Sequence, residues 1–291
     1  MHFRLAIMVQ TITLPMVLTP KPGEVSCSTS GQKNSETKKQ ELTDDQIIKK
    51  YLENGAWRIR YFSAEYQLYI DSAIAINPNM AYLYQQKAMP YFKQGKCELG
   101  LKSLDKAVEL DPKAHIDYRA FIKCIFAKTY EESIKDFQTA KKIKGEHGVV
   151  MDHSYDFYIG LCHLQLGDFS KSLDFLEKSI EHAKKTSGEN WVHYLELFYA
   201  GIATQELSQH NEAIRYFDKV LKEYPTFSDA KYYRALSLFR TDQIDQAEKI
   251  LTDCELDFKK GYTINEDNAV YEKYPYQIKQ FYIDALRLTK R

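Results

Sequence analysis

Residues 81–112 read AYLYQQKAMPYFKQGKCELGLKSLDKAVELDP, and the order of small residues, aromatic residues and proline in this stretch decides the fold. The same order returns along the chain at a spacing of 34 residues. Matching pairs at this spacing are Pro78 with Pro112, Ala88 with Ile122, and Gly201 with Ala235. Gly160 and Gly201 lie 41 residues apart, so one connection carries extra residues. A fixed period of this length predicts an array of repeated units.

Each unit is expected to be a hairpin of two antiparallel helices. Gly95, Gly167 and Ser208 stand where a tight turn would join the two helices. A small residue in the first helix, such as Gly160 or Gly201, lets the second helix approach closely. Apolar residues at i, i+3 and i+4 form a stripe that one hairpin cannot cover alone. Neighbouring hairpins must therefore stack and share one continuous core. The sequence predicts an all-α solenoid.

The period and the order of residues resemble those of the tetratricopeptide repeat (TPR) family over roughly residues 44–261. The resemblance implies helix-turn-helix hairpins stacked in a right-handed superhelix, with a concave groove lined by the first helix of every repeat. An array over residues 46–261 is predicted to hold about six repeats. Their expected bounds are 47–80, 81–114, 115–147, 153–187, 194–227 and 228–261. Residues 262–291 are expected to form a loop and a helix that cap the array. The helix is expected to run from about Pro275 to Lys290. A partner-docking role for that helix is the alternative.

The amino-terminal sequence predicts export. An apolar run from Leu5 to Leu18 is too short to span a bilayer and is typical of a signal peptide, here residues 1–26. Polar residues 27–45 are expected to form a flexible linker. Cys27 at its start resembles the lipid-modified cysteine of bacterial lipoproteins, although Glu24 departs from the aliphatic residue usual in that motif. Export without an anchor, and a cytoplasmic protein, remain alternatives.

The composition argues against several classes of function. The chain has 40 basic and 40 acidic residues, and no basic stripe favours nucleic acid. It lacks HExxH, GxSxG and phosphate-loop motifs, so no enzyme is predicted. His147, Asp152 and His153 could bind a metal, but a solvated loop is the favoured interpretation. Cysteines are spread over different repeats without a CxxC pair, so no metal site and no cofactor are predicted.

Binding of a protein or peptide is the function that this resemblance implies. First-helix residues at i, i+3 and i+7 are expected to face the groove, although any of them could instead pack into the array. The candidate groove residues are Tyr82, Gln85, Arg119, Lys123, Phe157, Phe198 and Tyr232. Within this set, Arg119 and Lys123 would form one cationic spot, unless they pair with acids of a neighbouring hairpin.

Three functions are compatible with these features. The leading one is a non-enzymatic scaffold in the cell envelope that holds a partner protein and contacts the membrane only through a lipid anchor. The alternative is an assembly or secretion factor, similar to the TPR-like lipoproteins that help to insert outer-membrane proteins. An accessory or cryptic hydrolase is a distant third.

Overall fold

The computed structural model describes residues 42–288 of the chain. The chain divides into two units, Met1–Glu41 and Leu42–Arg291. The predicted signal peptide and Cys27 therefore lie outside the described residues, and so does most of the predicted linker. None of the helices in residues 42–288 has both the length and the apolar character that a membrane span needs.

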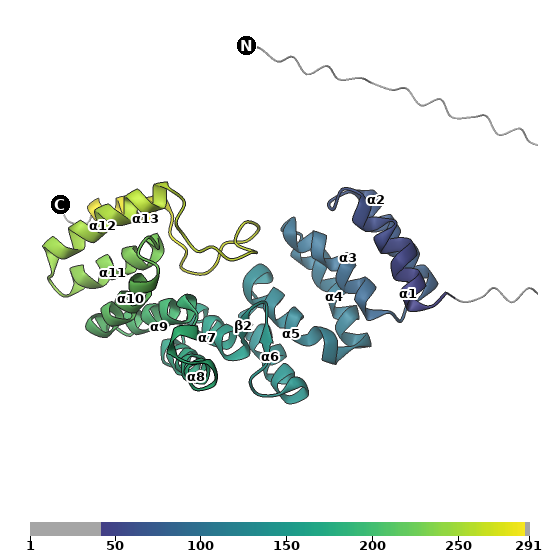
Figure 1. The fold of residues 1–291 in the computed structure, drawn as a ribbon, viewed down its shortest axis with the longest axis horizontal. Coiled ribbons are helices and arrows are strands. Elements are labelled where there is room, and N and C mark those ends of the chain that lie inside the picture. The colour runs from purple at the N-terminus through teal and green to yellow at the C-terminus, as the bar shows by residue number, and fades with distance from the viewer. Residues whose placement is uncertain (1–41, 289–291) are drawn as a thin grey trace, which may run out of the picture. The chain divides into compact units, whose positions relative to one another are not determined.

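Ten of the helices form five successive hairpins (Figure 1), and in each hairpin the second helix packs chiefly against the first. The pairs are α3 (Ala81–Lys93) with α4 (Cys97–Leu110), α5 (Pro112–Ile122) with α6 (Tyr130–Lys144), α7 (Tyr155–Gln165) with α8 (Phe169–Ser187), α9 (Tyr194–Glu206) with α10 (His210–Glu223), and α11 (Ser228–Arg240) with α12 (Ile244–Lys259). Each hairpin also packs against the next. The predicted all-α solenoid of stacked hairpins is confirmed.

Close approach of the paired helices explains the small residues in the first helix of each hairpin. A Cβ atom added at Gly201 would lie 2.7 Å from the Phe217 ring of α10, and one at Gly160 would lie 2.8 Å from Leu176 of α8. Real Cβ atoms do not approach other heavy atoms so closely, because protein interiors are packed to crystal density. The repeat therefore needs these glycines for packing rather than for an unusual backbone conformation.

The first unit of the array is less regular than the others. It consists of α1 (Asp44–Ile47), a π-helical turn (Ile48–Glu53), a 3-10 turn (Ala56–Arg58) and α2 (Ala64–Ile76). Thr43 and Gln46 form a reciprocal capping box that satisfies free amide groups at the start of α1. The predicted linker is therefore wrong at its end, because Asp44 and Asp45 already belong to a helix.

Two connections between hairpins carry residues beyond the repeat. The first contains the two-residue strands β1 (Val149–Val150) and β2 (His153–Ser154), which pair antiparallel. Met151 and Asp152 join them with φ angles of 47° and 66°, the left-handed backbone of the tightest hairpin turns. The second connection follows α8 and contains a 3-10 turn, Glu189–Trp191. It ends at His193, which caps α9.

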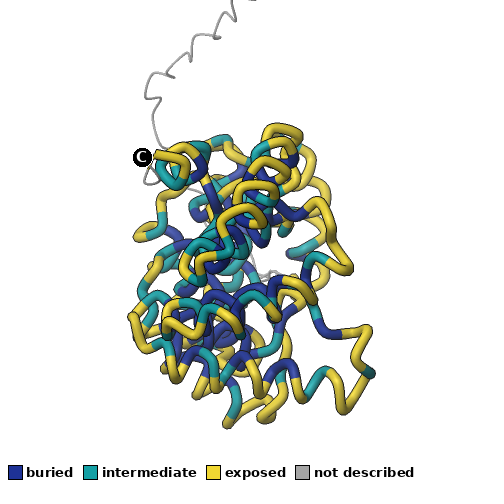
Figure 2. Tube along the Cα trace, turned by 90° about the vertical axis from the view of Figure 1, so that its left-hand side faces the viewer, coloured by how far each residue is buried: buried dark blue, intermediate teal, exposed yellow. Residues whose placement is uncertain are grey.

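Residues 262–279, called here the C-terminal segment, run along the first helices of the hairpins (Figure 1). Helix α13 (Gln280–Leu288) follows and packs against α12. The predicted terminal helix is thus too long, because its expected first residues, Pro275–Lys279, belong to the segment instead. In Figure 2 the buried residues follow the inner sides of the helices and the exposed residues lie outside.

Candidate functional site

Two of the predicted groove residues do not line an open surface. Phe157 and Phe198 have no solvent-exposed area and belong to the core shared by the hairpins. Tyr232 is half-buried, with its ring centre 6.3 Å from that of Tyr282 on α13, and it lines a cavity of about 620 Å³. Residues on successive positions of a helix point about 100° apart, so a small error in register moves a side chain from the groove to the core. The predicted groove is therefore wrong at Phe157 and Phe198, whereas the role of Tyr232 stays a prediction.

The predicted cationic spot is neutralised within the array. Arg119 donates to both carboxylate oxygens of Asp136 on α6, each at 2.8 Å, and Lys123 lies 2.9 Å from the same carboxylate. Arg119 also contacts Asp105 on α4 at 2.9 Å. The two cations thus join α5 to its neighbours, which was the alternative to a role in binding a partner.

The remaining two candidates lie on α3. Tyr82 packs against the hydrophobic cluster of the first unit, and Gln85 is half-buried. The seven candidate residues therefore do not come together in a single groove.

The C-terminal segment contacts the surface that a partner was expected to occupy. The Tyr199 hydroxyl donates to the carbonyl oxygen of Pro275 at 2.9 Å, and the Tyr233 hydroxyl donates to that of Tyr276 at 3.0 Å. Two further contacts join the segment to the amino-terminal hairpins. Lys128 pairs with Glu272 at 2.7 Å, and the Lys93 ammonium lies 4.8 Å from the centre of the Tyr271 ring.

Asp229, at the start of α11, holds both ends of the segment. One carboxylate oxygen accepts the Ile278 amide at 2.7 Å. The other accepts the Ile264 amide at 3.2 Å and the Thr263 hydroxyl at 2.7 Å. Asp229 is fully buried, so these donors satisfy a carboxylate that water does not reach. Because the Ile278 amide donates to Asp229, it is not available for a helical hydrogen bond within Pro275–Lys279.

Tyrosines at one repeated position mark this surface. Tyr158, Tyr199 and Tyr233 each stand two residues before the small residue of their first helix, and each is buried. They lie one residue after the predicted Phe157, Phe198 and Tyr232. The periodic tyrosine was a signal that sequence reasoning missed.

A cavity of about 570 Å³ lies beneath the segment. The π-helical turn that follows α5 (Lys123–Ala127) and the end of α7 supply one side, and the segment supplies the other. Its lining includes Ile125, Leu164, Tyr233, Tyr274 and Tyr276. The segment thus covers the surface without filling all of the space below it.

Asp229 should make the stability of the fold depend on pH. Burial raises the pKa of its carboxyl from 3.8 to about 6, against the effect of its hydrogen-bond donors. Between pH 4 and 6 the folded state therefore keeps a proton that the unfolded state has released, and the contribution of this group to stability falls as the pH rises. We expect the stability of the wild type relative to Asp229→Asn to decrease over this window and to level off above about pH 6. Urea unfolding at several pH values measures this, with Asp267→Asn as the control; a difference independent of pH would contradict the expectation.

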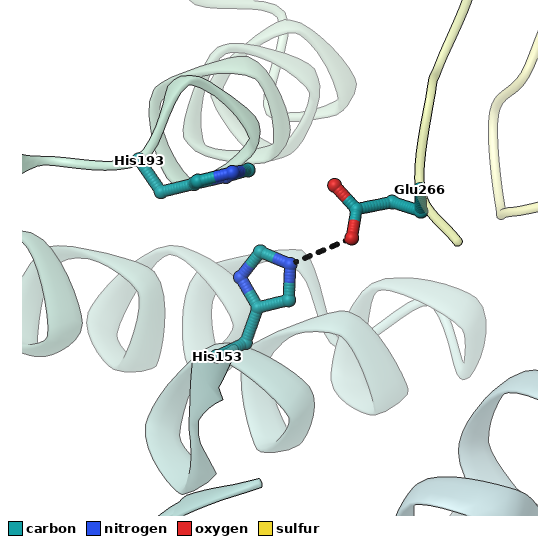
Figure 3. Close-up of side chains that lie close together, drawn as sticks. All are labelled: His153, His193 and Glu266. Carbon is teal, nitrogen blue, oxygen red and sulfur yellow. Dashed lines mark hydrogen bonds and ion pairs between the residues drawn. The ribbon is translucent and has the colours of Figure 1, made fainter. Parts of the chain in front are cut away.

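A second group of side chains meets at Glu266 of the segment (Figure 3). The Nε2 atom of His153 lies 3.3 Å from a carboxylate oxygen of Glu266, and the rings of His153 and His193 have centres 4.6 Å apart. The expected partner His147 is elsewhere, stacked on His182 with ring centres 3.8 Å apart. His153 thus meets residues that no sequence pattern links to it.

Comparison with known proteins agrees with this fold. Residues 206–258 match the family model described as "Tetratricopeptide repeat". The chain is 24% identical over 262 residues to Stress-induced-phosphoprotein 1 of Caenorhabditis elegans, a match that covers 85% of this chain and 74% of that protein.

Two solved structures are similar in fold. A tetratricopeptide repeat protein from Parabacteroides merdae is 17% identical, with a TM-score of 0.57 over 85% of this chain and 98% of the other. PilW, a widely conserved type IV pilus biogenesis factor, is 14% identical, with a TM-score of 0.58 over 74% of this chain and 94% of the other. Because the period, the stacked hairpins and the match of residues 206–258 agree, the described residues form an array of tetratricopeptide-type repeats.

Proposed function

We propose that this chain is a non-enzymatic scaffold that binds an extended segment of a partner protein along α7, α9 and α11, where its own C-terminal segment now lies. The observation that supports this is the kind of contact made there. Tyr199, Tyr233 and Asp229 all bond to backbone groups of the segment. Every peptide carries those groups, so a surface that recognises them suits extended chains, while pockets between the contacts select side chains.

In this proposal the C-terminal segment competes with the partner from within the same chain. A tethered competitor acts at a high effective concentration. The apparent affinity of the partner is then lowered in proportion to the fraction of molecules whose surface is free. A partner gains access to the surface when the segment detaches. The segment therefore covers the surface until a partner that binds strongly enough to displace it is present.

Loosening the segment should open this surface to a peptide. The test uses the full chain carrying Tyr274→Ala with Tyr276→Ala, and a fluorescein-labelled peptide of residues 262–279 as the probe. Fluorescence anisotropy should show saturable binding to this variant and at least about tenfold weaker binding to the wild type, whose own segment competes. Adding Tyr199→Phe with Tyr233→Phe should weaken binding about tenfold, since two hydrogen bonds are lost.

The control for this experiment is Phe281→Ala, which removes an exposed aromatic ring from α13 outside the segment. It should bind the peptide as weakly as the wild type. Circular dichroism should show unchanged helicity in every variant. Equal binding of the peptide to the wild type and to the loosened variant would mean that the segment does not occupy a binding surface. If the loosened variant binds the peptide as expected, it can serve as bait for cross-linking and identification of the natural partner.

We further propose that the chain acts in the cell envelope, tethered through Cys27. The signal-peptide pattern of residues 1–26 supports this location. Envelope assembly or secretion is the second candidate function, and fold similarity to PilW, a pilus biogenesis factor, favours it. Cys27→Ala should release the protein from membranes without changing its melting temperature, as measured by detergent partitioning and thermal unfolding. An unprocessed chain beginning at Met1 in the cytosol would contradict the envelope location.

A further inference from the structure

His153, His193 and Glu266 come from three stretches that the repeat does not require. His153 lies in the β1–β2 connection, His193 ends the connection between α8 and α9, and Glu266 belongs to the C-terminal segment. Helix pairing therefore does not account for their meeting. One potential ligand atom from each side chain lies within 4.8 Å of the other two. Their convergence from separate connections calls for an explanation other than hairpin packing.

The geometry of the group approaches that of a metal site. Zinc bonds of about 2.0–2.1 Å in a tetrahedron place neighbouring ligand atoms about 3.3 Å apart. The distance from His153 Nε2 to the Glu266 carboxylate is 3.3 Å, which is long for a hydrogen bond to a carboxylate but matches that edge. Small side-chain rotations would bring the remaining atom into place.

The surroundings of His153 hold its ring in place. His153 is 2% exposed, and its ring stacks on Phe157 with centres 4.1 Å apart, which fixes its orientation. Among the described residues, no hydrogen-bond partner faces its buried Nδ1 atom. Two imidazoles beside a carboxylate form a ligand set that is typical of zinc sites.

We propose that His153, His193 and Glu266 bind a divalent transition-metal ion of the zinc class, and that the ion ties the C-terminal segment to β2 and to the start of α9. Imidazole nitrogens disfavour Ca²⁺ and Mg²⁺, which prefer oxygen ligands. Three protein ligands leave a fourth position for water. Glu266 also lines a cavity of about 470 Å³, which offers a path for the ion. The site does not depend on the proposed function, because it rests on its own geometry.

Binding has a local cost at His193. Its Nδ1 atom accepts the Leu195 amide at 3.3 Å and so caps α9. A metal bond to the other ring nitrogen moves the proton to Nδ1 and ends this cap. The hydrogen bond is long, so the loss is small beside a metal bond.

The test titrates Zn²⁺ into the full chain after metal removal by a chelator, using isothermal titration calorimetry. The wild type should bind one ion per chain with a Kd below about 1 µM. Glu266→Gln, which keeps the shape of the side chain, should weaken binding by more than about 100-fold, because loss of a ligand exceeds the effect of losing a supporting hydrogen bond. Asp267→Asn is the matched control, since it removes one negative charge from the adjacent exposed residue and should leave the Kd unchanged.

Cobalt(II) absorption identifies the donor atoms. Coordination by nitrogen and oxygen should give visible bands without the intense near-ultraviolet band of cobalt–thiolate bonds. A thiolate band would place the ion on Cys124 and Cys162 and overturn the proposal. Loss of binding in His182→Gln would overturn it as well, because the ion would then sit on the stacked pair of His147 and His182. Equal affinity of the wild type and Glu266→Gln, or no binding by the wild type, would also count against the site.

Discussion

Asp136→Ala is expected to lower the free energy of unfolding by about 3 kcal/mol, because it removes the buried carboxylate that two poorly hydrated cations share. The Asp136 carboxylate accepts both hydrogen bonds from Arg119 and pairs with Lys123. The three side chains are only 10–17% exposed, so water cannot replace the lost partner well. Chemical unfolding followed by circular dichroism measures the loss.

A matched control comes from the same arginine. Asp105 pairs with Arg119 at 2.9 Å, but its side chain is 55% exposed. Asp105→Ala should therefore cost less than about 1 kcal/mol. A comparable loss in the two variants would contradict the view that burial decides the effect.

The position of Asp136 also bears on the predicted binding spot. Arg119→Glu combined with Lys123→Glu would place two new carboxylates beside Asp136. We expect this charge reversal to disrupt the α5–α6 hairpin, so it cannot serve as a clean test of partner binding.

Gly201→Leu is expected to lower stability by roughly 3 kcal/mol, at the upper end of the cost of overpacking. Even the first added atom would meet the Phe217 ring at 2.7 Å, and leucine adds three more carbons. The ring is fully buried in the α9–α10 hairpin and has little room to move. A decrease in melting temperature of about 6–12 °C should accompany the loss.

Asn211→Leu supplies the control for this prediction. It adds the same side chain to an exposed position of the same hairpin, where nothing must move. Its melting temperature should stay within a few degrees of the wild type. If Gly201→Leu has the same melting temperature as Asn211→Leu, the helices of this hairpin do not pack as closely as described.

The repeat itself could be predicted from sequence because its causes are local. Gly160 and Gly201 mark the helix contacts, and their spacing of 41 residues records one of the two longer connections. Small residues, turn residues and the apolar stripe all lie within one hairpin or its neighbour, so they leave a periodic trace. Part of the candidate surface could have been predicted, since the buried tyrosines recur at the same position of the repeat. The prediction chose the preceding residue, and a helix turns about 100° per residue.

What only the tertiary structure decided is the occupant of that surface and the meeting of its side chains. Lys128 and Glu272 are 144 positions apart, and His153 and Glu266 are 113 apart. Such contacts form once in the chain, so no period records them. They depend on where the stacked hairpins place their connections in space and on the path that Asp229 imposes on the C-terminal segment. Local sequence therefore determined the hairpins and their stacking, whereas long-range packing decided that the chain covers its own surface.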